Sequence, residues 1–221
     1  MFKGISVDII PTDEDEKEVD EYLAKIEQDR KADALKRYKA SGVPAKFYEE
    51  SFETFATDTD AMKVVKNRVM EFAEKPRNRI LILCGENGNG KTHLASSVIR
   101  KCGGIFVVSS MLCVQYDSAT SFKAKRSREE ILDYMSTCKM LVIDDCGKYP
   151  LNPELEKFLV SYIISARYSN NLPLVLTTNG KKEAFINFLG KAVYDRFTEV
   201  CTTVEFNWGS YRKSKRVQEG A

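Results

Sequence analysis

The sequence predicts an α/β fold in which helices cover both faces of a parallel β-sheet. Short apolar runs alternate along the chain with longer segments of helical periodicity. A glycine-rich loop, GENGNGKT, joins an apolar run to a helical one. A second apolar run, MLVIDD, ends in two carboxylates. Because parallel strands end at one edge of a sheet, the loop and these acids are expected to lie close together.

Composition is that of an ordinary globular protein. The chain has 221 residues, enough for one α/β domain with or without a small appendage. Charged residues make up 30% of the chain, and the net charge is only +2. Overall charge therefore does not favour nucleic-acid binding, and any basic surface must be local.

The cysteines and the termini predict a cytoplasmic protein. The six cysteines include no C-x-x-C pair, and His93 is the only histidine, which argues against a zinc site. We interpret the cysteines in apolar runs as buried free thiols, in keeping with a reducing cytosol. The sequence shows no signal peptide and no apolar run of membrane-spanning length.

Residues 12–39 are expected to form one helix, or two with a kink, before a break at residues 41–44. Thr12 is a plausible N-cap, and acidic residues come first and basic residues last, which complements the helix dipole. The apolar stripe has two open interpretations, packing on the chain's own core or binding a partner. The stripe consists of Val19, Tyr22, Leu23 and Ile26.

The remaining elements give five strands separated by helices. Residues 45–55 form an aromatic collar that we expect to pack on the core rather than to stack on bases. Its rings are Phe47, Tyr48, Phe52 and Phe55. The order that follows is helix 57–74, strand 80–84, helix 93–101, strand 105–109, a partly helical segment 111–135, strand 139–145, helix 153–168, strand 174–178, helices 181–189 and 191–200, and strand 201–206.

The glycine-rich loop matches G-x-x-x-x-G-K-[ST], the phosphate-binding P-loop. Its backbone N–H groups and the following helix N-terminus would cradle the phosphates of ATP. Lys91 would reach the β- and γ-phosphates, and the Thr92 hydroxyl would bind Mg²⁺. The predicted ATP-binding residues are Gly85, Glu86, Asn87, Gly88, Asn89, Gly90, Lys91, Thr92 and His93.

Three later segments supply candidate catalytic residues. We assign Asp144 to the metal and Asp145 to the attacking water, as at a Walker B strand end; two acids at a turn are the alternative. Asn179 could contact the γ-phosphate or the water, or simply form an Asn-Gly turn. Arg196 could be an arginine finger for a neighbouring subunit, or a salt-bridged surface residue.

Together these residues resemble the DnaC/DnaI helicase-loader branch of the AAA+ ATPases, which also contains the IstB transposition helpers. The resemblance rests on six segments: SGVP followed by SFE, GENGNGKTHLA as Walker A, LVIDDCG as Walker B, TTN as sensor 1, GKAVYDRF as the arginine-finger box, and the ending VEFNWGSYRKS. The ending is similar to that of DnaC-type loaders, which favours a loader over an IstB helper.

The resemblance implies a three-layer AAA+ fold with a parallel five-stranded sheet and a short helical N-terminal extension. The expected domains are residues 1–40 for helicase binding, 41–208 for the ATPase and 209–221 as a basic tail. Only 13 residues follow Trp208, so no C-terminal lid is expected. Asp145 stands where AAA+ proteins usually carry Glu, which implies slow ATP hydrolysis stimulated by DNA or a partner.

The resemblance also implies a helical insertion, here residues 111–135, as a candidate contact for single-stranded DNA. Its basic run is Lys123, Lys125, Arg126 and Arg128, with stacking by Tyr116 or Phe122. A solvated helix face is the alternative. The basic residues of the tail could form a second DNA contact or merely a soluble end: Arg212, Lys213, Lys215 and Arg216.

The function predicted by this resemblance is ATP-dependent loading of a DnaB-type replicative helicase onto single-stranded DNA. ATP and Mg²⁺ would lie between subunits of an AAA+ oligomer, with Arg196 acting in trans. Two alternatives remain open. One is an IstB-type transposition helper that binds duplex DNA, and the other is an adaptor that binds ATP without hydrolysing it.

Overall fold

The computed structural model describes residues 13–121 and 124–211. The chain divides into two compact units, Met1–Arg37 and Tyr38–Ala221.

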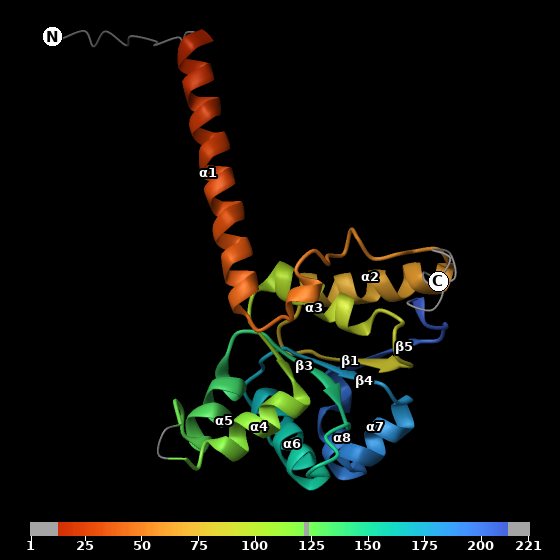
Figure 1. Ribbon diagram of the computed structural model, residues 1–221. Coiled ribbons are helices and arrows are strands. Elements are labelled where there is room, and N and C mark those ends of the chain that lie inside the picture. The colour runs from red at the N-terminus through yellow and green to blue at the C-terminus, as the bar shows by residue number, and fades with distance from the viewer. Residues whose placement is uncertain (1–12, 122–123, 212–221) are drawn as a thin grey trace, which may run out of the picture. The chain divides into compact units, whose positions relative to one another are not determined.

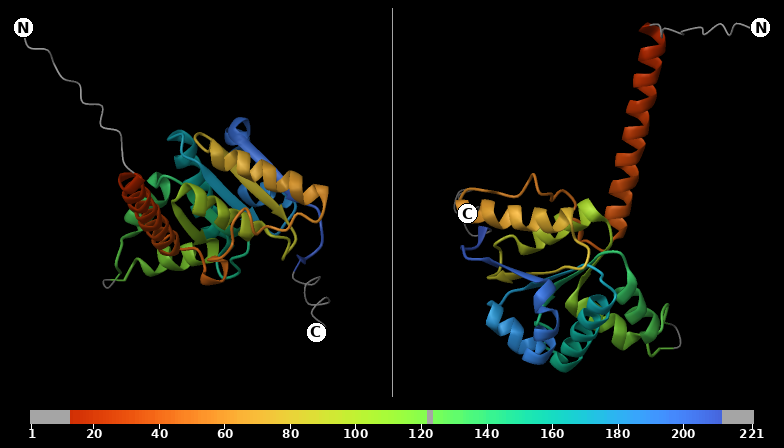
Figure 2. Two further views of the ribbon diagram at one scale, coloured as in Figure 1. Left: turned by 90° about the horizontal axis from the view of Figure 1, so that it is seen from above. Right: turned by 180° about the vertical axis from the view of Figure 1, so that it is seen from behind.

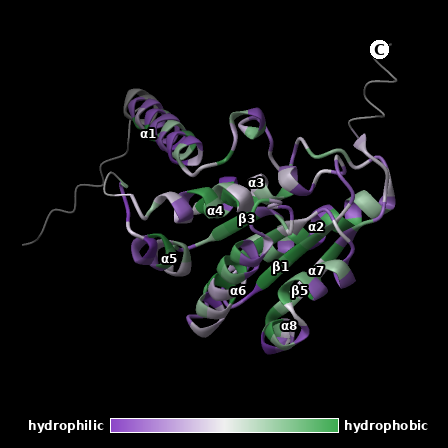
Figure 3. Ribbon diagram, turned by 60° about the horizontal axis from the view of Figure 1, so that its bottom comes forward, coloured by the Kyte–Doolittle hydropathy of each residue, from purple (hydrophilic) through white to green (hydrophobic). Residues whose placement is uncertain are grey.

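The first unit consists of most of helix α1 (Asp13–Ala40), a single uninterrupted helix over the range where one or two helices were expected. Of its side chains from residue 18 to residue 37, only Ile26 is partly buried. Figure 3 shows the helix as mainly hydrophilic. No helix within residues 13–121 and 124–211 is long and apolar enough to cross a membrane.

The second unit contains a five-stranded parallel sheet in the order β2-β3-β4-β1-β5. Strand β1, which leads into the P-loop, lies between β4 and β5 and pairs with both in parallel. The strands are β1 (Ile80–Gly85), β2 (Ile105–Val108), β3 (Leu141–Cys146), β4 (Leu174–Thr178) and β5 (Cys201–Phe206).

Helices cover both faces of the sheet, so the predicted three-layer α/β fold with five parallel strands is confirmed. Figures 1 and 2 show α2 and α3 on one face and the other helices of this unit on the opposite face. The helices are α2 (Asp60–Glu74), α3 (Lys91–Cys102), α4 (Ser109–Ser118), α5 (Arg128–Thr137), α6 (Pro153–Ser169), α7 (Lys182–Leu189) and α8 (Lys191–Phe197), with short 3-10 turns at Ala45–Phe47 and Thr198–Val200.

Side chains that point alternately to the two faces of the sheet divide the core into two parts. In β1, Leu81 and Leu83 join the core under α2 and α3, whereas Ile80 and Ile82 join the core under α4 to α8. Strands buried on both faces read as continuous apolar runs, which is why the sequence shows them so clearly. Figure 3 shows these strands as hydrophobic. Phe47, Phe52 and Phe55 of the aromatic collar are buried in the first core, as expected.

Several predicted boundaries move by one to three residues in the structure. Helix α3 begins at Lys91 rather than at residue 93, because its N-cap residue Gly90 leaves helical geometry with a left-handed φ of 98°. The segment 111–135, expected to be helical in parts, belongs to two helices separated by residues 119–127. Ser127 and Glu130 form a capping box that starts α5, so the chain must leave helical geometry before that point.

The six cysteines are free thiols, and Cys84, Cys113 and Cys146 are buried. Burial raises the pKa of Cys84 and of Cys113 to about 12. Neutral, buried thiols of this kind act as small apolar residues in the core.

Arg167 on α6 is fully buried although no carboxylate pairs with it among the described residues. Its guanidinium donates to the carbonyl oxygen of Pro173 at 2.6 and 3.2 Å and to that of Met135 at 2.8 Å. Burial lowers its pKa. The side chain thereby joins the end of α5 to the segment that enters β4.

Replacing Arg167 with Met should destabilise the second unit, because two buried carbonyl groups lose their donors. We expect the free energy of unfolding to fall by about 2–4 kcal/mol in urea titrations. Arg68→Met, at an exposed position of α2, is the control and should change it by less than about 0.5 kcal/mol. Equal stability of the two variants would contradict this role for Arg167.

Candidate active site

A cleft of about 490 Å³ opens at the carboxyl ends of the parallel strands, where α/β sheets bind ligands. The P-loop forms its floor, and the ends of β3 and β4 contribute polar side chains. The collar segment and the chain beyond β5 form an aromatic side, with Phe47, Phe55, Trp208 and Tyr211. Ten of the predicted site residues therefore line one cleft: Asn87, Gly88, Asn89, Gly90, Lys91, Thr92, His93, Asp144, Asp145 and Asn179.

The P-loop depends on glycine where the chain turns into α3. A Cβ atom at Gly90 would lie 2.6 Å from the ring of Phe55, and the residue has a φ of 98°. A side chain there would be strained and would collide with the collar. The turn directs the first N–H groups of α3 toward the cleft, as phosphate binding requires.

The side chain of Lys91 is held inside the loop. Its Nζ donates to the carbonyl oxygens of Gly85 at 2.7 Å and Glu86 at 2.6 Å, and to Oδ1 of Asn89 at 3.1 Å. Burial lowers its pKa to about 8, although the charges of Asp144 and Asp145 oppose this shift. A phosphate anion would compensate the desolvated ammonium group.

Asn89 links this lysine to the far end of the chain. Its side-chain Nδ2 donates to the carbonyl oxygen of Phe206 at 3.1 Å, and its own carbonyl accepts from Nε1 of Trp208 at 3.1 Å. The backbone N–H of Tyr211 donates to Gly88 at 2.9 Å. The end of β5 and the segment after it are thus bonded to the P-loop at three points, which no local sequence pattern indicated.

Asp144 lies buried at the end of β3 and accepts hydrogen bonds from hydroxyl groups on two other elements. Thr92 Oγ1 donates to its carboxylate at 3.1 and 3.2 Å, and Thr177 Oγ1 donates at 2.6 Å. Burial raises the pKa of Asp144, and the two hydroxyl groups oppose that shift. The acid, the P-loop helix and β4 therefore form one bonded unit.

Asp145 turns out of the strand toward the cleft. The pairing of β3 with β4 is irregular between Ile143 and Cys146, and Asp145 has a φ of 62°, which Asp tolerates better than most residues. Its N–H donates to Thr177 Oγ1 at 2.9 Å, and Asn179 Nδ2 donates to its carboxylate. Thr177 therefore orients both acids, a role that the sequence analysis missed.

The oxygen donors at the end of β3 suit Mg²⁺. A hydroxyl group from Thr92 and a carboxylate from Asp144 are hard ligands, and a nucleotide and water would supply the rest. Within the described residues, no group of three or more His, Cys, Asp or Glu side chains could hold a metal ion.

His93 faces the collar as well as the cleft. Its Nδ1 lies 2.7 Å from the Glu50 carboxylate and its Nε2 lies 2.7 Å from the Ser51 carbonyl oxygen. The ring also meets Phe55 edge-on. These contacts join the first turn of α3 to the collar, and they occupy both ring nitrogens of a residue expected to bind ATP.

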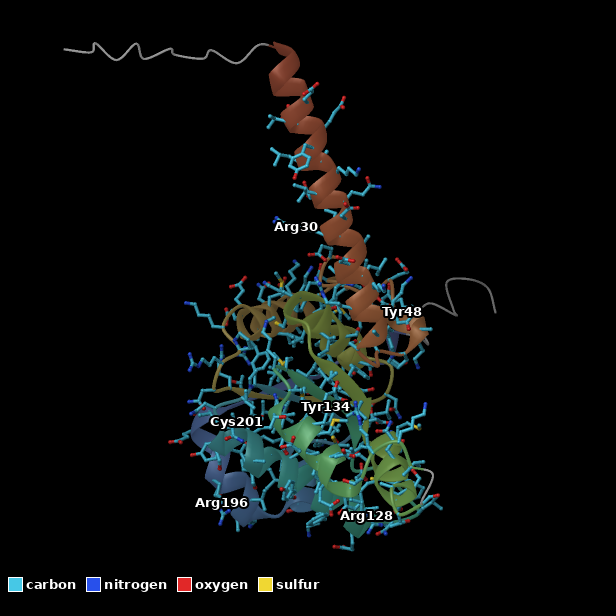
Figure 4. All side chains as sticks on the ribbon, turned by 90° about the vertical axis from the view of Figure 1, so that its left-hand side faces the viewer. Arg30, Tyr48, Arg128, Tyr134, Arg196 and Cys201 are labelled. Carbon is cyan, nitrogen blue, oxygen red and sulfur yellow. The ribbon has the colours of Figure 1, made fainter. Side chains whose placement is uncertain are left out.

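Arg196 is exposed on α8 and does not line the cleft of its own chain. Figure 4 shows it at one end of the helical layer and Arg128 at the other. An arginine finger acts on a neighbour's nucleotide, so its role stays a prediction.

The basic run expected to contact DNA lies mostly in the loop between α4 and α5. Lys123, Phe122 and the basic tail residues Arg212, Lys213, Lys215 and Arg216 lie outside the described residues. Lys125 is exposed, and the guanidinium of Arg126 stacks 4.3 Å from the Tyr134 ring centre. Arg128 lies 4.7 Å from the Tyr116 ring centre and donates to the Tyr116 carbonyl, so it is already engaged within the chain.

The fold and the cleft together define a nucleotide-binding protein of the P-loop class. The model of the IstB-like ATP-binding protein family matches residues 14–219, and the chain belongs to that family.

Two relatives support this assignment. A protein of insertion sequence IS232 from Bacillus thuringiensis subsp. berliner, described by its name as ATP-binding, is 30% identical over 159 residues, which are 65% of this chain and 58% of that protein. The uncharacterised protein YqaM of Bacillus subtilis strain 168 is 26% identical over 82% of this chain and 62% of its own length. The chain thus spans about three fifths of each curated relative.

Solved structures share the fold at low identity. The DnaC helicase loader superposes with a TM-score of 0.63 at 20% identity, over 73% of this chain and 99% of that one. DnaI gives 0.60 at 17% identity, over 76% and 93%. The initiator DnaA bound to AMPPCP and single-stranded DNA gives 0.59 at 16% identity, over 80% and 56%.

Replacing Asp144 with Asn should separate stability from metal use. The amide removes a buried charge whose pKa is raised by burial, so the free energy of unfolding without nucleotide should rise at pH 7. The affinity for ATP should fall about tenfold in Mg²⁺ but stay unchanged in EDTA, because the metal loses its carboxylate.

Calorimetry with both buffers measures the affinities, and Asp133→Asn on the exposed face of α5 is the matched control. An Asp144→Asn protein that keeps the full Mg²⁺ enhancement would remove this residue from the metal site.

Proposed function

We propose that this protein is an ATP-driven switch that loads a replicative helicase of the DnaB type onto single-stranded DNA. The observation that carries the ATPase part is the cleft that gathers Lys91, Thr92, Asp144, Asp145 and Asn179. These residues come from three separate segments, and each has the chemistry that phosphoryl transfer to water requires.

Each residue has a distinct role in this proposal. Lys91 neutralises charge on the β- and γ-phosphates, and Thr92 and Asp144 hold Mg²⁺. When bound, Mg²⁺ would stabilise the charge on the phosphate oxygens. Asp145, held by Thr177 and Asn179, orients the attacking water and directs its proton, and Asn179 also faces the γ-phosphate.

The geometry favours slow hydrolysis that awaits a neighbour. Asp is shorter than the usual Glu, and the Asp145 carboxylate is already engaged by Asn179 and Lys148. Arg196 lies away from the cleft of its own chain, so a second subunit in an AAA+ oligomer would have to bring it there.

The helicase-loader assignment draws on the fold and on α1. The superposition covers 99% of the compared DnaC chain and 73% of this one. Within the first unit, Val19, Tyr22 and Leu23 are each at least 55% exposed on one stripe of α1, as in helices that bind a partner's groove. We therefore assign residues 1–40 to the helicase, 41–208 to ATP and 209–221 to a basic tail.

An insertion-sequence helper is the second candidate. The 30% identity to the IS232 protein and the family match favour it. Such a protein would act on duplex DNA together with a transposase rather than on single strands with a helicase.

Replacing Arg196 with Ala should leave the affinity for ATP within about twofold but lower DNA-stimulated hydrolysis at least tenfold. An Asp145→Asn variant should also be inactive. An equal mixture of the two should recover about a quarter of the wild-type rate, since random pairing of subunits rebuilds that share of sites.

The turnover of phosphate in the mixture measures the recovery, and Arg68→Ala is the control for a lost surface arginine. Full activity of Arg196→Ala alone would exclude the finger, and no recovery on mixing would exclude action in trans.

A binding assay with single-stranded and duplex oligonucleotides separates the two candidate functions. With ATP and Mg²⁺, we expect at least tenfold preference for the single strand, weakened by salt because phosphates are neutralised. Arg126→Ala should reduce this binding severalfold, because it removes an exposed guanidinium next to Tyr134. Preference for the duplex would favour the insertion-sequence helper instead.

A further inference from the structure

Lys148 lies in the loop after β3 and contacts both the P-loop and the acid Asp145 of the candidate active site. Its Nζ is 3.3 Å from Oδ1 of Asn87 in the P-loop and 3.6 Å from Oδ1 of Asp145. It belongs to neither the P-loop motif nor the pair of acids, and the sequence analysis did not single it out. Its ammonium group therefore bridges the phosphate-binding loop and the acid proposed to direct water.

The backbone around Lys148 is fixed by a buried carboxylate on the far side of the loop. Glu156 on α6, only 1% exposed, accepts the N–H groups of Gly147 and Tyr149, both at 2.9 Å. It also accepts the hydroxyl of Ser109, at the start of α4, at 2.5 Å. Because the residues on both sides of Lys148 are bonded, its Cα position is set before a ligand arrives.

The exposure of Lys148 and the nearby charge of Lys91 favour the binding of an anion between them. Its side chain is 41% exposed, so the ammonium can move without breaking a buried contact. Its charge is one of those that lower the pKa of Lys91, which places the two cations within electrostatic reach of each other. A phosphate group between them would relieve this repulsion.

Other cations are placed less well for this task. Lys46 lines the cleft on its aromatic side and lies 4.8 Å from the Phe47 ring centre. Arg196 is exposed on α8, outside the cleft of its own chain. Lys148 contacts the loop that cradles the phosphates, on the side where Asp145 and Asn179 lie.

We propose that Lys148 is a catalytic residue that binds the γ-phosphate of ATP in its own subunit and releases Asp145 to the attacking water. This inference rests on the proposed ATPase function. In hydrolysis, water forms a bond to the γ-phosphorus while the bond to the β,γ-bridging oxygen breaks. ADP leaves, and Asp145 directs the proton of the water to the γ-phosphate, which is released as inorganic phosphate. Lys148 keeps its own proton throughout and stabilises the negative charge on the equatorial oxygens of the γ-phosphate.

The experiment compares Lys148→Met, Lys148→Arg and a matched control, Lys63→Met. Lys63 is an exposed lysine that pairs with Asp60 at the same spacing of three residues. Calorimetry gives the affinities of each protein for ADP and for AMPPCP, an analogue that keeps a γ-phosphonate, both with Mg²⁺. Single-turnover hydrolysis of ATP gives the rate of the chemical step.

Lys148→Met should keep the wild-type affinity for ADP, lose about tenfold in affinity for AMPPCP and slow the chemical step at least tenfold, because only the γ-group loses a charged contact. Lys148→Arg should restore part of the AMPPCP affinity. Lys63→Met should match the wild type in all three measurements.

The outcomes distinguish this inference from the function on which it rests. A wild-type protein that binds neither nucleotide would overturn both. A wild-type protein that hydrolyses ATP, with Lys148→Met indistinguishable from Lys63→Met, would overturn the role of Lys148 alone. Faster hydrolysis by Lys148→Met would also overturn it, because the lysine would then only restrain Asp145.

Discussion

One buried carboxylate holds the two halves of the site together. Asp144 is 6% exposed at the end of β3, and a charge so placed is costly unless hydrogen bonds satisfy it. The hydroxyl groups that do so come from Thr92 on α3 and Thr177 on β4. The need to satisfy this acid therefore fixes the distance between the phosphate-binding loop and the strand ends, and the other polar contacts of the cleft follow from it.

A second buried carboxylate, Glu156, has a different task. It accepts three hydrogen bonds from the loop after β3 and from the start of α4, and it faces away from the cleft. Asp144 thus joins β3 to α3 and β4, whereas Glu156 joins α6 to the loop after β3 and to α4. Asp144 lines the cleft, whereas Glu156 fixes backbone N–H groups of the loop after β3. Both are buried carboxylates, and only their hydrogen-bond partners distinguish a ligand-binding acid from a structural one.

Local patterns in the sequence predicted the parts of the site that are local. The P-loop, the acids at the end of β3 and Asn179 after β4 were found because each directly follows an apolar run of sequence. Contacts between distant segments were missed. Asn89 meets Trp208 and Phe206 across 119 and 117 residues, and Thr177 meets Asp144 across 33. Strand order is likewise set by packing between distant elements.

The position of β1 in the sheet has a consequence for how the protein is made. This strand carries the P-loop, yet its partners β4 and β5 begin at Leu174 and Cys201, far later in the chain. During synthesis on the ribosome, β1 must therefore wait with both edges unpaired until β4 is added, and with one edge unpaired until β5 follows. Pairings so distant in sequence are slow to form, and the nascent strand is open to aggregation or chaperone capture until they do.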